Sequence, residues 1–164
     1  MASGDSLLMF TPAAAEFPAS NYATFDTRNN HLVLDFDTTT AETVYFKGVM
    51  PQHYAGTTGV TVYLHYAAST ATSGTIQWSV AFERVSDSIQ DIDSDGFAAV
   101  NDTTAATVPG TSGHVDINSV AFTDGADMDS VTAGDGFRMS VARDVAGDSA
   151  AGDAELWAIE IRET

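Results

Sequence analysis

Apolar and polar residues alternate with a period of two along most of the chain. Leu32, Leu34 and Phe36, for example, are separated by Val33 and Asp35. This period is typical of a strand that is buried on one face. The same alternation recurs in segments 44–46, 60–66, 76–82, 115–117, 120–122, 137–141 and 157–161. The pattern therefore predicts about eight strands.

Clusters of glycine and small polar residues separate these predicted strands. They lie at 37–40, 55–59, 72–74, 109–113, 123–125 and 146–148. Such clusters are typical of chain reversals. Because no long segment of helical period lies between the strands, the pattern favours antiparallel pairing over a parallel α/β sheet. We predict an all-β domain over residues 31–164, an antiparallel two-sheet jelly-roll sandwich.

The first thirty residues fit this pattern poorly, because they carry Pro12, Pro18 and isolated aromatic residues. We predict that residues 1–30 form an extended N-terminal arm or an irregular edge strand. Such an arm either packs on its own sandwich or reaches a neighbouring subunit. The candidate interface residues are Phe10, Phe17, Tyr22, Phe25, Tyr45 and Tyr63.

The aromatic residues inside the predicted strands divide by their phase. Trp78 and Trp157 alternate in step with inward Val, Ile and Phe residues, so both are predicted to pack in the core. Tyr45 and Tyr63 fall on the opposite phase. They are therefore candidates for a sugar-stacking platform or a subunit interface. The four histidines have no metal-ligand spacing, and His65, on the polar phase of its strand, is interpreted as a surface or interface side chain.

Charge and composition restrict the partners. The 164 residues include 6 Lys plus Arg against 23 Asp plus Glu, a net charge of −17. This balance argues against nucleic acid, because phosphate binding requires clustered cations. There is no cysteine, so disulfides and thiolate chemistry are excluded. The apolar run at 7–10 is too short for a signal peptide or a membrane span, and we expect synthesis in a host cytoplasm and no membrane partner.

One acidic segment matches a calcium-binding loop. Asp91, Asp93, Asp95 and Gly96 follow the pattern D-x-D-x-D-G, and Asp102 takes the twelfth position in place of the usual glutamate. A set of oxygen ligands suits Ca²⁺. The pattern lacks flanking helices, so the alternative is a solvated acidic loop. Calcium is the only cofactor that the sequence suggests. A second acidic group, Asp144, Asp148, Asp153 and Glu155, is interpreted as exposed loop carboxylates.

Three motifs carry a resemblance to a known family. Residues 46–54 match F-x-G-x-x-P-x-x-Y, residues 72–78 match T-S-G-x-(I/V)-x-W, and residues 133–144 match A-G-D-x-F-R-(L/M)-x-(V/I)-x-R-D. In these motifs the chain resembles small jelly-roll structural proteins of tailed bacteriophages. The resemblance extends over about residues 32–163, and its motifs belong to a scaffold and not to an active site.

The resemblance implies a virion structural protein. We expect a decoration or cement protein on the outer surface of a phage capsid, assembled as a homotrimer and partnered by the major capsid protein. The alternative is a carbohydrate- or receptor-binding module of a tail fibre, with a glycan as partner. No nucleophile elbow G-x-S-x-G occurs in the sequence, and we expect no enzymatic activity.

Overall fold

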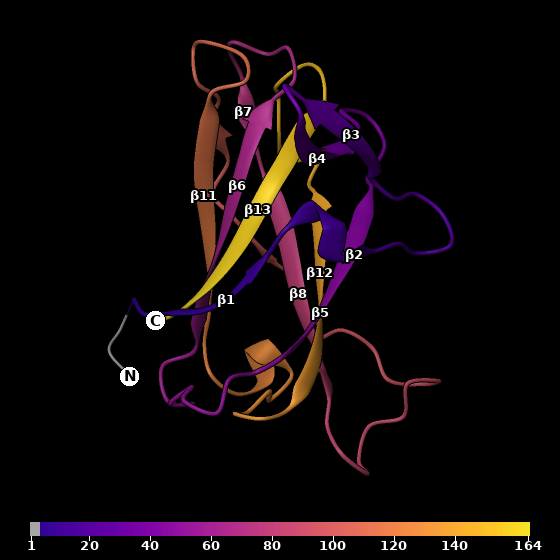
Figure 1. Cartoon of the computed structure of the whole chain (residues 1–164), viewed down its shortest axis with the longest axis vertical. Coiled ribbons are helices and arrows are strands. Elements are labelled where there is room, and N and C mark those ends of the chain that lie inside the picture. The colour runs from indigo at the N-terminus through magenta and orange to yellow at the C-terminus, as the bar shows by residue number, and fades with distance from the viewer. Residues whose placement is uncertain (1–3) are drawn as a thin grey trace.

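Two antiparallel β-sheets pack face to face in the computed structural model, which describes residues 4–164 (Figure 1). The six-stranded sheet has the order β11 (Val115–Phe122), β6 (Val60–Ala68), β13 (Ala154–Glu163), β4 (His31–Phe36) and β3 (Thr24–Arg28), and β1 (Ser6–Phe10) also pairs with β13. The five-stranded sheet has the order β2 (Ala15–Glu16), β5 (Thr43–Val49), β12 (Gly136–Arg143), β8 (Trp78–Val85) and β9 (Asn101–Asp102).

The long strands β4, β5, β6, β8, β11, β12 and β13 alternate between the two sheets along the chain. Successive strands therefore cross the sandwich, and the predicted all-β jelly-roll sandwich is confirmed. The remaining elements are a ribbon of β7 (Thr75–Ile76) and β10 (Ala106–Thr107), and two 3-10 turns, η1 (Pro12–Ala14) and η2 (Ala126–Met128). Within residues 4–164, no helix is long and apolar enough to cross a membrane.

The core lies between the sheets and is built from the predicted inward positions. Trp78 is fully buried, with its ring 5.0 Å from that of Phe36 and 5.3 Å from that of Tyr66. Both contacts are edge-to-face, the geometry that aromatic pairs favour. The prediction that Trp78 packs in the core is confirmed.

The N-terminal segment packs on its own sandwich. β1 pairs with β13, β3 forms an edge of the six-stranded sheet, and β2 forms an edge of the five-stranded sheet. The ring of Phe10 is buried 5.5 Å from Phe46 and 6.4 Å from Phe137. Phe10 was predicted as an interface residue, and this is wrong because its side chain fills the core. Residues 1–3 of the predicted arm lie outside the described residues.

Candidate functional site

A β-bulge in β13 turns Trp157 out of the core. Leu156 and Ala158 pair with consecutive residues of β6, so Trp157 is an extra residue in its strand. Leu156 and Ile159 are both buried, whereas Trp157 is 43% exposed. The prediction of a core position for Trp157 is wrong, because one inserted residue reverses the alternation of faces.

The sequence carried a signal for this bulge. Leu156 and Ile159 are both apolar, but they are an odd number of residues apart. Two such residues cannot face the same side of a regular strand, because the side-chain period is two. An insertion between them restores the inward position of both, and Trp157 or Ala158 must then be the residue that is displaced.

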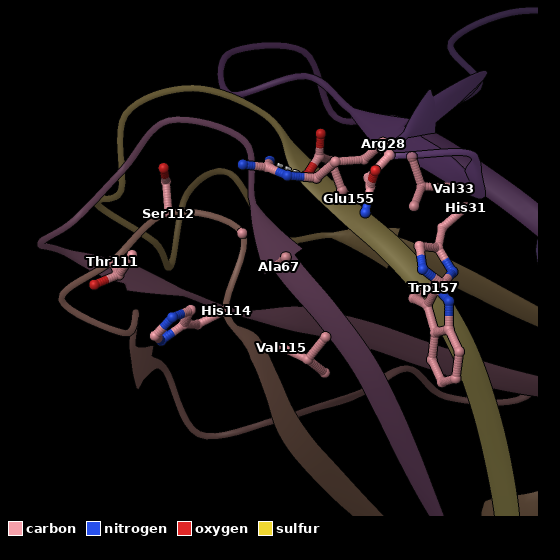
Figure 2. Close-up of a pocket in the computed structure, with 12 residues that line it drawn as sticks. Arg28, His31, Val33, Ala67, Thr111, Ser112, His114, Val115, Glu155 and Trp157 are labelled. Carbon is pink, nitrogen blue, oxygen red and sulfur yellow. Dashed lines mark hydrogen bonds and ion pairs between the residues drawn. The ribbon is translucent and has the colours of Figure 1, made fainter.

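A hollow of about 570 Å³ lies beside Trp157, on the face of the six-stranded sheet that is turned away from the core (Figure 2). Ala67 of β6 lines it between Val115 of β11 and Glu155 of β13, its partners across the two strand pairs. The short side chain of Ala67 leaves this space open. The other lining residues are Arg28, Asn29, His31, Val33, Thr111, Ser112, Gly113 and His114.

The hairpin of β3 and β4 forms one rim of the hollow. Arg28 and His31 are cross-strand partners, and only Asn29 and Asn30 lie between them. Both asparagines have positive φ, 48° and 65°, as a two-residue hairpin turn of type I′ requires. Asparagine tolerates this conformation, so the tight turn holds Arg28, Asn29 and His31 at the edge of the sheet.

The segment 111–114 forms the opposite rim. The N–H of Gly113 donates to the carbonyl oxygen of Ala68 at 3.0 Å, and its φ is 79°. A Cβ at Gly113 would lie 2.6 Å from Nη2 of Arg28. The positive φ favours glycine here, and the absence of a Cβ lets the guanidinium of Arg28 lie close to the backbone. The contact closes this end of the hollow.

The charges that border the hollow cancel each other. Arg28 donates to the carboxylate of Glu155 and to the carbonyl oxygen of Ser69. Glu155 is 5% exposed and is the only carboxylate among the lining residues. It was interpreted from the sequence as an exposed loop carboxylate, which is wrong because Arg28 covers it. In a chain of net charge −17, this surface offers hydrogen-bonding groups without a free carboxylate.

Three of the four histidines gather around the hollow, although they are far apart in the sequence. The rings of His31 and His65 lie 6.5 Å and 6.4 Å from that of Trp157, and His114 lines the rim opposite. Each neutral imidazole offers one donor and one acceptor. The exposed indole is thus bordered by groups that can bond to hydroxyls.

A group of acids lies behind Arg28. Asp26, Asp35 and Glu155 place carboxylate oxygens within 4.8 Å of one another, and in the part of the chain that is described no other such group of three ligand residues occurs. Burial, and after it the negative charge of Glu155, raise the pKa of Asp35 to about 6. One oxygen of Asp35 is buried without a hydrogen-bond partner. Asp35 therefore weakens the fold when it is ionised.

Replacing Asp35 with asparagine is expected to stabilise the protein near neutral pH. Because the pKa of Asp35 is higher in the folded protein than its ordinary value of 3.8, the protonated carboxyl stabilises the fold. This contribution is fully present below about pH 3.8 and is lost as the pH rises through about 6. Asparagine does not ionise, so the variant keeps this stability at high pH. Above about pH 7 we expect its free energy of unfolding to exceed that of the unmodified protein by about 1–2 kcal/mol. This is less than the full pKa shift would give, because the group is partly solvated. Urea unfolding of both proteins across the pH range measures the difference.

Asp37→Asn is the matched control for this change. The carboxylate of Asp37 accepts hydrogen bonds from the N–H groups of Thr39 and Thr40, and these lower its pKa. Its contribution has the opposite sign, so this variant should lose stability at neutral pH. A gain for Asp35→Asn that is equally large at about pH 4 would contradict the role of its ionisation.

The four carboxylates predicted to bind calcium are not brought together. Asp91, Asp93 and Asp95 lie in an exposed loop, where Asp91 accepts from the N–H of Asp93 at 3.0 Å. Asp102 lies in β9 and accepts from the hydroxyl of Ser79 at 2.6 Å. Among residues 4–164, no three of these side chains place oxygens within 4.8 Å of one another. Calcium binding at these residues stays a prediction that the geometry does not support.

The two tyrosines predicted to face outward lie on different sheets. Tyr63 of β6 is on the same face as the hollow, with the guanidinium of Arg162 4.2 Å above its ring. Tyr45 of β5 stacks on Phe97 at 5.4 Å, with Arg138 4.7 Å above both rings. The two side chains therefore do not form one platform.

The remaining predicted interface residues form an aromatic patch of Phe17, Tyr22 and Phe25. The ring of Phe17 lies 5.4 Å from that of Tyr22 and 5.2 Å from that of Phe25, and all three are exposed. The structure thus groups these residues on the surface, although it does not show a partner.

Comparisons with known proteins found likeness at the level of structure only. No family model and no curated protein sequence matches the chain. A xylan-binding module, CBM15, is similar over 96% of this chain and 97% of its own, with 6% identity and a TM-score of 0.47. The CBM22-1 and GH10 modules of Clostridium thermocellum xylanase 10B, complexed with xylohexaose, are similar over 99% of this chain and 28% of theirs, with 10% identity and a TM-score of 0.46. Likeness at this level does not identify what this chain binds.

Proposed function

We propose that the chain is a carbohydrate-binding module whose site is the hollow beside Trp157. The exposed indole of Trp157, bordered by hydrogen-bonding groups and by no carboxylate other than Glu155, which is paired with Arg28, carries this proposal. A pyranose ring has an apolar face of C–H groups and a rim of hydroxyls. The apolar face suits an indole, and the hydroxyls suit the imidazole, amide and hydroxyl groups of His31, Asn29 and Thr111.

The size and lining of the hollow, together with the net charge of the chain, support a saccharide over other ligands. A volume of about 570 Å³ lies in the range of sites that hold small molecules. The net charge of −17 opposes nucleic acid. The lining combines apolar Val33 and Val115 with polar residues, a mixture that fits a ligand with both kinds of surface.

The burial and ion pairing of Glu155 favour a site that binds a saccharide without hydrolysing it. Hydrolysis of a glycosidic bond uses two carboxyl groups that reach the scissile bond from opposite sides. Glu155 is the only carboxylate that lines the hollow, and it is buried against Arg28. We therefore propose that the site holds its ligand and does not cleave it.

Calorimetric titration with a saccharide panel tests this function. The panel contains cellohexaose, xylohexaose, maltohexaose and chitohexaose, and we expect at least one to bind. Ala67→Met fills the hollow without removing a contact, so it should weaken binding by about tenfold or more. Val49→Met places the same side chain at an exposed position of the five-stranded sheet and should bind as the unmodified protein does. Absence of binding across the panel, or unchanged binding by Ala67→Met, would contradict the proposal.

The virion role implied by the sequence resemblance is a second proposal, supported by a different surface. The aromatic patch exposes three rings in contact, one pair tilted and one pair edge-to-face, and aromatic residues are enriched where protein partners bind. A decoration protein that attaches to a capsid through this patch would leave the hollow free for a saccharide. The two proposed functions are therefore compatible in one chain.

A further inference from the structure

The face that holds the hollow continues along β6. From Ala67 the outward side chains of this strand are His65 and then Tyr63, and the four residue steps from Ala67 to Tyr63 span about 13 Å. Ile117 lies across from His65 on β11, exposed on this face. An apolar and aromatic track therefore leads away from Trp157.

A second aromatic position lies at the far end of this track. The guanidinium of Arg162 covers the ring of Tyr63 at 4.2 Å, and its Nη2 donates to Glu160 at 2.6 Å. The hydrogen bond from Arg162 lowers the pKa of Glu160, which keeps this pair charged. A guanidinium fixed in this way presents a flat surface and further N–H donors.

The hollow is closed at one end, so the track can run only toward Tyr63. Gly113 closes against Arg28 at the end near the β3–β4 hairpin. Tyr63 lies at the other end of the same strand face, beside Ser119 of β11 and Glu160 of β13. Ser119 is the cross-strand partner of Tyr63 and is small, so β11 places no bulky side chain directly beside the Tyr63 position.

We infer that the ligand is an oligosaccharide, with one end in the hollow and the chain running along β6 to a second contact at the Tyr63–Arg162 pair. This inference rests on the proposed saccharide site and deepens it. Trp157 holds the sugar ring nearest the hollow, and Arg162 binds hydroxyls of a ring further along the same chain. The affinity should therefore grow with the length of the saccharide.

Titration with saccharides of one to six units, in each sugar series of the panel, tests the inference. For the unmodified protein we expect the hexasaccharide of the binding series to bind about tenfold or more tightly than its disaccharide. Arg162→Met keeps the length of the side chain and removes its donors and charge, and it should abolish this gain without changing disaccharide binding. Tyr63→Leu should act in the same way. Lys47→Met removes a positive charge from the five-stranded sheet and should keep the gain.

The outcomes separate this inference from the proposed function. Equal affinity for short and long saccharides, or a gain with length that Arg162→Met and Tyr63→Leu both keep, would overturn the inference and leave the saccharide site standing. Absence of binding to every series would overturn both. The melting temperature of each variant identifies any loss that comes from unfolding.

Discussion

Replacing Trp157 with alanine is expected to remove most saccharide binding and to leave the fold intact. Aromatic residues at the centre of a binding site contribute about 2–4 kcal/mol when truncated, which is a loss of about 30-fold to 1,000-fold in affinity. Trp157 is displaced from the core by the bulge, so its removal should change the free energy of unfolding by less than about 1 kcal/mol. Calorimetric titration and thermal unfolding of the same sample measure both quantities.

Trp78→Phe is the matched control, because Trp78 is the other tryptophan of the chain and is fully buried. It should retain saccharide binding and lose stability, since the smaller ring leaves a cavity beside Phe36 and Tyr66. The two variants thus have opposite expected effects. Unchanged binding by Trp157→Ala would contradict the assignment of the site.

Arg143→Met is expected to lower the free energy of unfolding by about 3–5 kcal/mol, because it leaves a buried acid without its partner. Arg143 is 1% exposed at the end of β12 and is paired with Asp148. Its Nη1 and Nη2 donate to the carbonyl oxygens of Phe36, Gly152 and Ala150. One guanidinium therefore joins three segments of the sandwich. Urea unfolding gives the loss directly.

A second substitution separates the charge from the packing. Arg143→Met combined with Asp148→Leu removes both members of the ion pair, so no unpaired carboxylate stays buried. We expect the double variant to recover part of the lost stability. A loss below about 1 kcal/mol for Arg143→Met alone would show that the guanidinium does not hold these segments together.

Regular strands could be predicted from the sequence because one phase of alternation fills the core. Val60, Val62 and Leu64 of β6 are buried as this phase requires, and so are Val80 and Phe82 of β8. Here local periodicity and tertiary packing agree. The fold class follows from such segments.

In β11 the alternation pattern alone divides one strand into two. The apolar positions at 115–117 and 120–122 have opposite phases, and they were predicted as two strands. They form one regular strand, in which Val115 and Ile117 are exposed and Val120 and Phe122 are buried. The inward polar side chain of Asp116 is satisfied by the hydroxyl of Tyr66 at 3.0 Å. The pattern does not show which phase faces the core, because the answer depends on the strand partner.

The candidate site was not predictable from spacing along the chain. Its residues come from the β3–β4 hairpin, from β6, from segment 111–114 with the start of β11, and from β13 at its bulge. Only the fold brings these segments together. The Asn29–Asn30 turn and the odd separation of Leu156 and Ile159 were local signals, but they indicate backbone geometry and not a ligand.

The two indole N–H signals in a ¹H–¹⁵N NMR spectrum provide the most direct test of a saccharide site at Trp157. Trp157 lies beside the hollow and Trp78 lies in the core, so the buried residue is an internal reference. Addition of the tightest-binding hexasaccharide of the panel should shift the signal of Trp157 and leave that of Trp78 in place. A Trp157 signal that does not move at saturation would contradict the proposed site.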